Sequence, residues 1–320
     1  MEHDAGQARV SPVGGPGEVA QPVGGPVREL LRVAPGAAVD LAAVDPRSTP
    51  GLPDARLTGP QRKGWARRQV ELVGAGLARQ QEMLFAGAKA DPTAGQRVLL
   101  VLQAMDCGGK DGTIKRVVGA MNPLGVHIRS FGPPSAEELE HHFLWRIRRA
   151  LPPPGCLGVF NRSHYEDILV PRVQAEAPEQ VWRPRYAEIE DFERELTGAG
   201  VRLVKVFLHI SYGEQARRLL ARLDDPTKHW KYHPSDVDAR ARWDDYQVAY
   251  GDLLGRSGTD VAPWYVVPAD RKWYRDWAVA HLLRETFDTL ALGYPPADFD
   301  IARERERLLG TAGPVKVNRS

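Results

Sequence analysis

The sequence predicts an α/β fold, a three-layer α/β/α sandwich built on a five-stranded parallel sheet. Five short apolar segments alternate with longer stretches of helical pattern, and these segments are residues 97–104, 126–131, 156–160, 201–210 and 264–269. Near-continuous apolar strands are typical of parallel sheets that are buried on both faces. Two parallel strands must be joined by a crossover, which is usually a helix. We therefore expect a layer of helices on each face of the sheet.

Helix signals lie before and between the expected strands. Helical patterns occur in four segments, residues 65–89, 135–149, 184–198 and 211–222. In the second and the fourth, a serine is followed three residues later by a glutamate, which is the spacing of a capping box. In the third, Pro184 fits the first turn of a helix that ends at Gly198 or Gly200. These signals support the order of elements that a parallel sheet requires.

The two ends of the chain differ from this pattern. Residues 1–58 are rich in Gly, Pro, Ala and Val and contain no aromatic residue. We expect this extension to be flexible or to lie across the surface, because it offers little apolar material for a core. The α/β pattern predicts one domain over residues 59–295, followed by a tail over residues 296–320.

The composition is that of a soluble globular protein. The chain has 320 residues, a net charge of +2 and 42% hydrophobic residues. This balanced charge does not indicate binding to nucleic acid, and no apolar run is long enough to cross a membrane. Two cysteines, Cys107 and Cys156, exclude a disulfide framework and fit a reducing compartment. We therefore expect a cytoplasmic protein.

A glycine-rich loop follows the first expected strand, at residues 104–113. A strand, a glycine-rich turn, a lysine and a helix form the arrangement in which backbone N–H groups and the helix N-terminus bind phosphate. The loop departs from the pattern G-x-x-x-x-G-K-[ST] at Ala104 and Asp111. The alternative is a tight turn with a surface lysine. The predicted phosphate-binding residues are Gly108, Gly109, Lys110, Asp111, Gly112 and Thr113.

Acidic residues beside this loop indicate a metal ion. Asp106 lies within the loop, and a carboxylate next to phosphate is costly unless a cation such as magnesium accompanies it. A second polar loop, residues 161–167, follows the third expected strand. Its Arg162 can bind phosphate through two hydrogen bonds, and an acid there would hold magnesium against phosphate oxygens. The alternative is an ion pair on the surface.

A basic cluster follows the fourth expected strand, in a segment that we expect to form a lid over residues 212–245. In phosphotransferases such a lid closes over the transferring group and excludes water. The alternative is a solvated helix face. The cluster contains five cations, Arg217, Arg218, Arg222, Lys228 and Lys231. So many cations in one segment of a chain with balanced charge favour a long polyanion as the ligand.

Five motifs, in this order, resemble the second polyphosphate kinase family, the polyphosphate:nucleotide phosphotransferases. They are MDCGGKDGT (105–113), FNRSHYEDILV (160–170), RLDDPTKHWK (222–231), RWDDYQVAY (242–250) and APWYVVPADRKWYR (262–275). The resemblance runs from about residue 65 to about residue 292. It implies a thymidylate-kinase-like P-loop fold and a reversible transfer between polyphosphate and nucleotides. It also implies a requirement for Mg²⁺, with Mn²⁺ as an alternative ion.

The resemblance implies roles for four residues of these motifs. Asp106 would bind magnesium, and Lys110 would bind the phosphates. Arg162 and Arg222 would stabilise the transferring phosphoryl group.

Two further positions are implied less directly. Many relatives have Asp where Asn161 stands, so Asp167 is our candidate for the second metal ligand. The HYED sequence (164–167) resembles the subgroup that phosphorylates nucleoside monophosphates, some members of which also accept diphosphates. We therefore expect Glu166 to set the nucleotide specificity.

The resemblance implies inorganic polyphosphate as one substrate and AMP, ADP, GMP or GDP as the other, in a homodimer or homotetramer. Two other functions stay open. One is an ATP-dependent nucleoside monophosphate kinase, whose phosphate loop should lie closer to the usual pattern. The other is a sensor that binds polyphosphate or nucleotide without turnover.

Overall fold

Five parallel strands form one sheet at the centre of the domain. The computed structural model describes residues 18–53, 57–93 and 95–311. The strand order is β2-β3-β1-β4-β5, and all four neighbouring pairs are parallel. The strands are β1 Arg97–Gln103, β2 Val126–Ser130, β3 Leu157–Asn161, β4 Val201–His209 and β5 Trp264–Pro268. The α/β sandwich with five parallel strands that the sequence predicts is confirmed.

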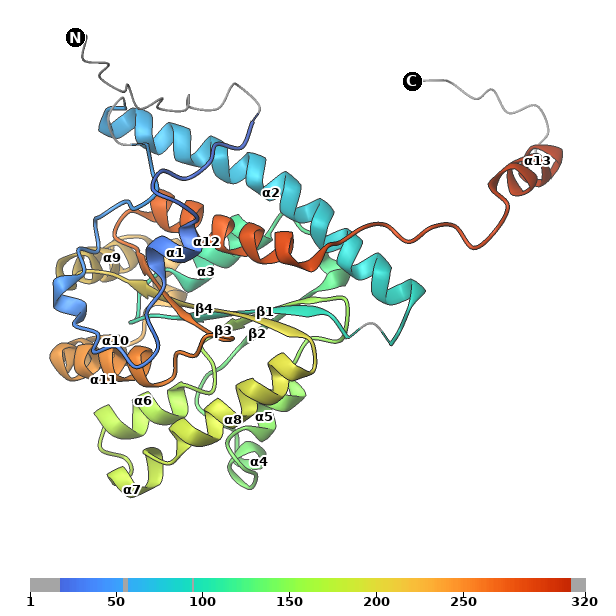
Figure 1. Cartoon of the computed structure of the whole chain (residues 1–320). Helices are drawn as coiled ribbons and strands as arrows, with labels where there is room; N and C mark the ends of the chain where they lie inside the picture. Colours follow the sequence, from blue (N-terminus) through green and yellow to red (C-terminus); the bar gives the residue numbers. More distant parts are fainter. Residues whose placement is uncertain (1–17, 54–56, 94, 312–320) are drawn as a thin grey trace, which may run out of the picture.

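Helices cover both faces of the sheet (Figure 1). On one face lie α2 Gly59–Ala90 and α12 Lys272–Phe287, whose apolar side chains share a core with β1 and β4. On the other face lie α6 Glu166–Val173, α8 Arg185–Gly198 and α11 Trp243–Arg256, around a second core. The long helix α2 begins six residues before the expected start, after a capping box formed by Thr58 and Gln61.

The central strand β1 lies between β3 and β4 and is buried apart from its first residue, Arg97. Its residues Val98–Leu102 have no solvent exposure, as expected for a strand covered on both faces. Because neighbouring strands are parallel, the loops after β1, β3 and β4 lie at the same edge of the sheet. That edge is where α/β folds bind their ligands. After β1 the chain enters the short helix α3 Lys110–Thr113, which continues as the π-helical turn η2 Ile114–Val118.

The helix expected over residues 135–149 is interrupted. The capping box opens α4 Ala136–Leu139 as predicted, but α5 Trp145–Arg149 is a separate helix. Between them the chain turns at His142, whose backbone oxygen accepts a hydrogen bond from Trp145 and whose Nδ1 accepts one from the Leu144 N–H. Local hydrogen bonds of this kind replace the helical pattern. The expectation of one continuous helix was therefore wrong.

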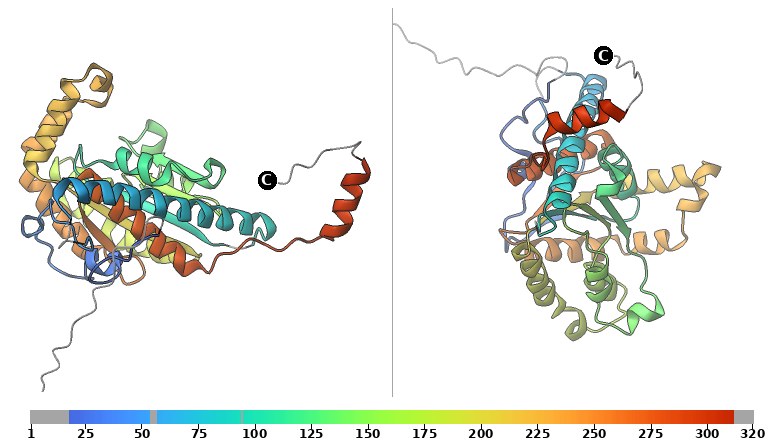
Figure 2. Two further views of the ribbon diagram at one scale, coloured as in Figure 1. Left: turned by 90° about the horizontal axis from the view of Figure 1, so that it is seen from above. Right: turned by 90° about the vertical axis from the view of Figure 1, so that its right-hand side faces the viewer.

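The segment between β4 and α11 projects from the domain (Figure 2). It consists of α9 Tyr212–Leu223, the 3₁₀ turn η4 Pro226–Lys231 and α10 Ser235–Ala241. Of the remaining short elements, η3 Pro123–Gly125 lies before β2, α7 Glu179–Trp182 lies before α8, and η5 Asp288–Leu290 follows α12.

Residues 18–53 lie along the domain and bury apolar side chains against it. The helix α1 Val27–Leu31 buries both of its terminal residues, and Leu41 in η1 Leu41–Ala43 is also buried. Backbone pairing ties this segment to the edge of the sheet, since Arg32 forms an antiparallel bridge with Tyr265 of β5. The first 17 residues of the predicted extension lie outside the described part.

Within the predicted C-terminal tail, α13 Ile301–Thr311 projects away from the domain (Figure 1) and has no buried residue. Residues 312–320 lie outside the described part. None of the described helices has the length and apolar character needed to cross a membrane.

Candidate active site

A strongly basic cleft of about 620 Å³ lies beside the loops that follow β1 and β3 and is bordered by the projecting segment. Three carboxylates line it, from Asp106, Asp111 and Asp236. Ten cationic side chains also line it, which are Lys110, Arg116, Arg162, Arg217, Arg218, Arg222, Lys228, Lys231, Lys272 and Arg275. The excess of positive charge suits a ligand with many negative charges.

The glycine-rich loop after β1 adopts a conformation that requires its glycines. Gly109 has φ of 107°, a left-handed conformation that glycine adopts without strain. A Cβ atom on Gly108 would collide with Ala104, and one on Gly109 would collide with the guanidinium of Arg275. The loop therefore leaves its backbone close to the cleft and ends at α3, as expected for phosphate binding.

Lys110 is buried and lines the cleft. Its ammonium group donates a hydrogen bond of 2.9 Å to the backbone oxygen of Ala104, at the other end of the loop. Burial lowers the pKa of Lys110, and the nearby charge of Arg162 lowers it further. A cation held in this way gains stability when an anion binds next to it.

Arg162 and Asp106 join the loops after β3 and β1. The Arg162 guanidinium donates a hydrogen bond of 2.6 Å to Asp106 Oδ1. Burial opposes the charge of Arg162, but Glu166 and Asp106 outweigh this effect and hold its pKa above the ordinary value. Arg162 also has φ of 63°, an uncommon backbone conformation for a residue other than glycine.

Asp111 connects the phosphate loop with the projecting segment. Its carboxylate accepts a hydrogen bond of 2.9 Å from Asn161 and one of 3.1 Å from the Lys231 ammonium group. Burial opposes ionisation, but these two hydrogen bonds hold the pKa of Asp111 below its ordinary value. The side chain at the usual Ser/Thr position of the loop therefore contacts both the projecting segment and the end of β3.

The neighbours Arg217 and Arg218 in α9 have different environments. Arg218 is buried and donates hydrogen bonds to the backbone oxygens of Cys107 (2.8 Å) and Ala269 (2.6 Å). Arg217 points outward, with 64% of its side chain exposed, and pairs with Glu214. Arg218 therefore holds the phosphate loop against the loop after β5, whereas Arg217, although paired with Glu214, stays exposed at the cleft.

The remaining predicted cations are also at the cleft. Arg222 donates hydrogen bonds to the Lys231 backbone oxygen (2.7 Å) and to Asp236 (3.2 Å). Lys228 pairs with Asp225 at 2.6 Å. Thr113, in contrast, is fully buried, and its hydroxyl donates to the Gly109 backbone oxygen at 3.2 Å.

The structure does not bring Asp167 to the cleft. Its carboxylate accepts a hydrogen bond of 3.1 Å from Arg146, in α5, and it is absent from the cleft lining. Burial raises the pKa of Asp167, although the charge of Arg146 opposes this shift. Glu166 does not line the cleft either. Burial raises its pKa above the ordinary value, and the charges of Arg162 and Lys110 only partly oppose this shift.

Several residues at the cleft are missing from the sequence prediction. Arg275 in α12 is buried and pairs with Asp276 at 2.6 Å. Lys272 in the same helix lines the cleft, and its pKa is lowered by burial and then by the charges of nearby arginines. The sequence contains an indication of both residues. They are basic and follow the last apolar strand, and the residues after such strands lie at the ligand-binding edge of the sheet.

A buried network supports the loop that holds Arg162. Lys205, in β4, donates hydrogen bonds to Glu193 (2.5 Å), to the hydroxyl of Tyr165 (3.0 Å) and to the backbone oxygen of Ser257 (2.7 Å). Tyr165 in turn donates to Glu193 at 2.7 Å. A buried charge requires such a set of partners, and the network fixes Tyr165 three residues after Arg162.

The family of the chain follows from comparison with known proteins. Residues 70–291 match the family described as Polyphosphate kinase 2. The chain belongs to the polyphosphate kinase 2 family. The match covers the sheet, the cleft and the projecting segment, so the resemblance seen in the five sequence motifs is confirmed.

Similar proteins of this family match over most of their length. The AMP/ADP-polyphosphate phosphotransferase of Meiothermus ruber is 44% identical over 82% of this chain and 94% of that protein. The ADP-polyphosphate phosphotransferase of Rhodopseudomonas palustris is 42% identical over 76% and 84%. The crystal structure of polyphosphate kinase 2 from Arthrobacter aurescens TC1 has a TM-score of 0.83 and 46% identity, and covers 89% of this chain and 97% of that one.

Proposed function

We propose that this member of the polyphosphate kinase 2 family transfers a phosphoryl group from inorganic polyphosphate to a nucleotide. The observation that carries the proposal is the cleft itself, in which ten cations surround a glycine-rich loop at the end of a buried strand. The printed names of its relatives, at 42% and 44% identity, support the same activity. These relatives disfavour an ATP-dependent kinase and a sensor without turnover.

A second basic hollow continues the cleft and suits the length of polyphosphate. It has a volume of about 810 Å³ and shares Arg116, Arg217 and Lys272 with the cleft. Beyond these it is lined by Arg47, Lys63, Arg67 and Arg271. Two of its acidic side chains pair with lining cations, Glu214 with Arg217 and Asp276 with Arg116. Seven cations against four acids still leave the lining positive. A long polyanion would occupy both hollows at once.

The mechanism requires little covalent chemistry from the protein. A nucleotide phosphate oxygen is already anionic near neutral pH, so it can attack the terminal phosphorus of polyphosphate without a strong general base. The terminal phosphoanhydride bond breaks, and polyphosphate shortened by one phosphate leaves. The chain contributes position and positive charge, through Lys110, Arg162 and Arg222, which all line the cleft. These cations would neutralise charge on the transferring group, and the lid would exclude water.

The donor set of the cleft fits a magnesium ion that arrives with the substrate. No group of three or more metal-binding side chains occurs among the residues that the structure describes. Magnesium in phosphate sites usually takes one or two carboxylates and completes its shell with phosphate oxygens and water. We propose Asp106 as the protein ligand, because its carboxylate lines the cleft. When bound, the ion would neutralise phosphate charge, and Mn²⁺ could replace it.

For the acceptor we propose AMP and ADP, with GMP and GDP as further candidates. The relative from Meiothermus ruber is named for AMP and ADP, and one from Pseudomonas aeruginosa is named for GDP. Glu166 stays our candidate for a residue that affects this choice, since its charge interacts with those of Arg162 and Lys110. A homodimer or homotetramer and a cytoplasmic location also stay predictions.

The acceptor is tested by product analysis. The purified protein is incubated with polyphosphate, Mg²⁺ and one nucleotide at a time, from AMP, ADP, GMP and GDP. We expect ADP from AMP and ATP from ADP. Formation of no nucleotide product from any of the four would contradict the proposal, and binding of polyphosphate without turnover would favour a sensor.

A further inference from the structure

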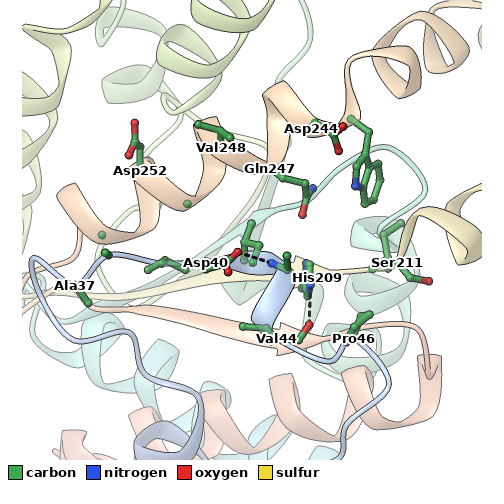
Figure 3. A pocket seen from close by; sticks show the side chains of 18 of the residues that line it. Ala37, Asp40, Val44, Pro46, His209, Ser211, Asp244, Gln247, Val248 and Asp252 are labelled. Carbon is green, nitrogen blue, oxygen red and sulfur yellow. Dashed lines mark hydrogen bonds between the residues drawn. The ribbon is translucent and has the colours of Figure 1, made fainter.

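The projecting segment has two arms, α9 and α10, which are joined at its base. Tyr212 begins α9 and Trp243 begins α11, directly after α10, and their rings pack edge to face with centroids 5.3 Å apart. Arg240 of α10 donates a hydrogen bond of 2.7 Å to the backbone oxygen of Tyr212. Both rings line a cavity of about 1000 Å³, which Figure 3 shows with Ser211 and Asp244 at one end. This cavity shares no lining residue with the basic cleft, so the base is held together away from the cleft.

A second connection between the arms lies at the cleft itself. Arg222 near the end of α9 and Asp236 in the first turn of α10 both line the cleft, and a hydrogen bond of 3.2 Å joins them. The Arg222 guanidinium also donates to the backbone oxygen of Lys231 at 2.7 Å. The backbone N–H of His233 lies 3.5 Å from the same oxygen of Asp236. Asp236 therefore connects Arg222 with the turn between the two arms.

Asp236 is largely buried although its segment projects from the domain. Only 11% of its side chain is exposed. Burial raises the pKa of Asp236, the charge of Asp106 raises it further, and the charge of Arg222 opposes the shift. A buried carboxylate is costly unless a cation pairs with it. Arg222 is that cation, so each side chain restricts the position of the other.

This pairing uses only one nitrogen atom of the Arg222 guanidinium. Both hydrogen bonds come from Nη1, and no acceptor for Nε or Nη2 is found in the described part of the chain. Neither atom is buried without a partner, so both are open to solvent. Arg218, four residues earlier, differs, because its Nε, Nη1 and Nη2 all donate to protein acceptors. The N–H groups of Nε and Nη2 are parallel, which suits two oxygens of one phosphate group.

We propose that Asp236 is a positioning residue for phosphoryl transfer, which orients Arg222 so that its Nε and Nη2 face the transferring group. The inference rests on the proposed function, in which Arg222 neutralises charge on that group. The alternative is a purely structural tie between the arms, but the contacts at the base already provide one. A guanidinium held at one nitrogen before the substrate binds is preorganised for the transition state.

The test is a double-mutant cycle on steady-state rates with Asp236→Ala and Arg222→Met. We expect Asp236→Ala to lower kcat by about tenfold with little change in KM for AMP, because Arg222 would act on the transferring group. In the Arg222→Met background the same change should cost less than about twofold more, because Asp236 acts through Arg222. Asp236→Asn keeps an oxygen acceptor for Arg222 and should recover most of the rate. Asp238→Asn, exposed on the same helix, should leave kcat unchanged.

Three results would each overturn the proposal. They are a normal kcat in a folded Asp236→Ala variant, a rise in KM for AMP at unchanged kcat, and a further tenfold loss in the Arg222→Met background. Thermal unfolding checks that each variant is folded, and Asp236→Leu, which fills the space without accepting a hydrogen bond, replaces an Ala variant that is not.

The choice of donor separates this proposal from the proposed function. If the protein uses ATP and not polyphosphate, the proposed donor is wrong, but the cycle is measured with ATP and the role of Asp236 is still decided. Turnover with polyphosphate but without coupling between Asp236 and Arg222 overturns the positioning role alone. Absence of turnover with either donor overturns both.

Discussion

The guanidinium of Arg162 and the carboxylate of Asp106 lie 2.6 Å apart and connect the loops that follow two neighbouring strands. Each side chain is only partly buried, and each faces the basic cleft. The pair therefore places a phosphate-binding cation beside the proposed metal-binding carboxylate. Phosphate would compete for Arg162, and a metal ion would compete for Asp106, so we expect both ligands to separate the pair.

The metal requirement should depend on Asp106. Asp106→Asn removes the proposed carboxylate ligand, so we expect the Mg²⁺ concentration for half-maximal activity to rise by about tenfold. Asp167→Asn is the comparison, because Asp167 is bonded to Arg146 and does not line the cleft. The measurement is initial rate against Mg²⁺ concentration. A rise for Asp167→Asn and none for Asp106→Asn would reverse the two assignments.

Two neighbouring arginines in α9 should respond differently to removal of charge. Arg218→Met leaves the backbone oxygens of Cys107 and Ala269 without their donor, so we expect a loss of about 3 kcal/mol in the free energy of unfolding. Arg217→Met removes an exposed cation and should weaken polyphosphate binding with little change in stability. Urea denaturation and titration with polyphosphate distinguish the two effects. Equal loss of stability in both variants is not compatible with these roles.

The second basic hollow should matter only for long polyphosphate. Lys63 and Arg67 have no ion-pair partner among the described residues, and they line this hollow but not the cleft at the phosphate loop. We expect the double change Lys63→Ala with Arg67→Ala to raise KM for long chains by about tenfold and to leave KM for tripolyphosphate unchanged. Arg68→Ala is the matched control, since Arg68 is exposed on the same helix but lines neither hollow. The same rise in KM for both chain lengths would argue against an extended binding path.

Stability below neutral pH should depend on His281. Burial lowers the pKa of this histidine, in α12, to about 3, whereas the unfolded chain has the ordinary value of about 6.5. Between these two values the unfolded chain binds a proton that the folded chain does not, so the free energy of unfolding falls as pH falls. His281→Gln should therefore weaken the dependence of Tm on pH between 6.5 and 4. The exposed His127→Gln should not, and an unchanged slope in His281→Gln would contradict the pKa shift.

The five strands and the loops that follow them could be predicted because the signal is local. A strand such as Val98–Leu102 is buried on both faces, so its sequence is continuously apolar. The order of such strands along the chain indicates a parallel sheet, and its carboxyl edge then brings residues of separate loops together. For this reason the sequence alone predicts that Asp106, Lys110 and Arg162 belong to one site.

Contacts that depend on tertiary packing could not be predicted in this way. Arg275 reaches the phosphate loop from a buried position in α12. Its place after the last strand indicates the ligand-binding edge of the sheet, but not this contact. Asp167 of α6 is bonded to Arg146 of α5, a helix from a different part of the chain, and does not line the cleft. The burial of Val27 and Leu31 could not be predicted either. Their helix is little more than one turn long, and so short an apolar pattern is not recognisable in a Gly/Pro-rich segment.

One measurement tests most directly whether polyphosphate is the phosphoryl donor. The protein is incubated with AMP, Mg²⁺ and either polyphosphate or ATP, and the rate of ADP formation is measured. We expect ADP from polyphosphate in the absence of ATP, and a loss of about three powers of ten in rate for Lys110→Ala. Lys115→Ala, an exposed lysine that does not line the cleft, should keep the full rate. Formation of ADP only when ATP is supplied, or a full rate for Lys110→Ala, would contradict the account.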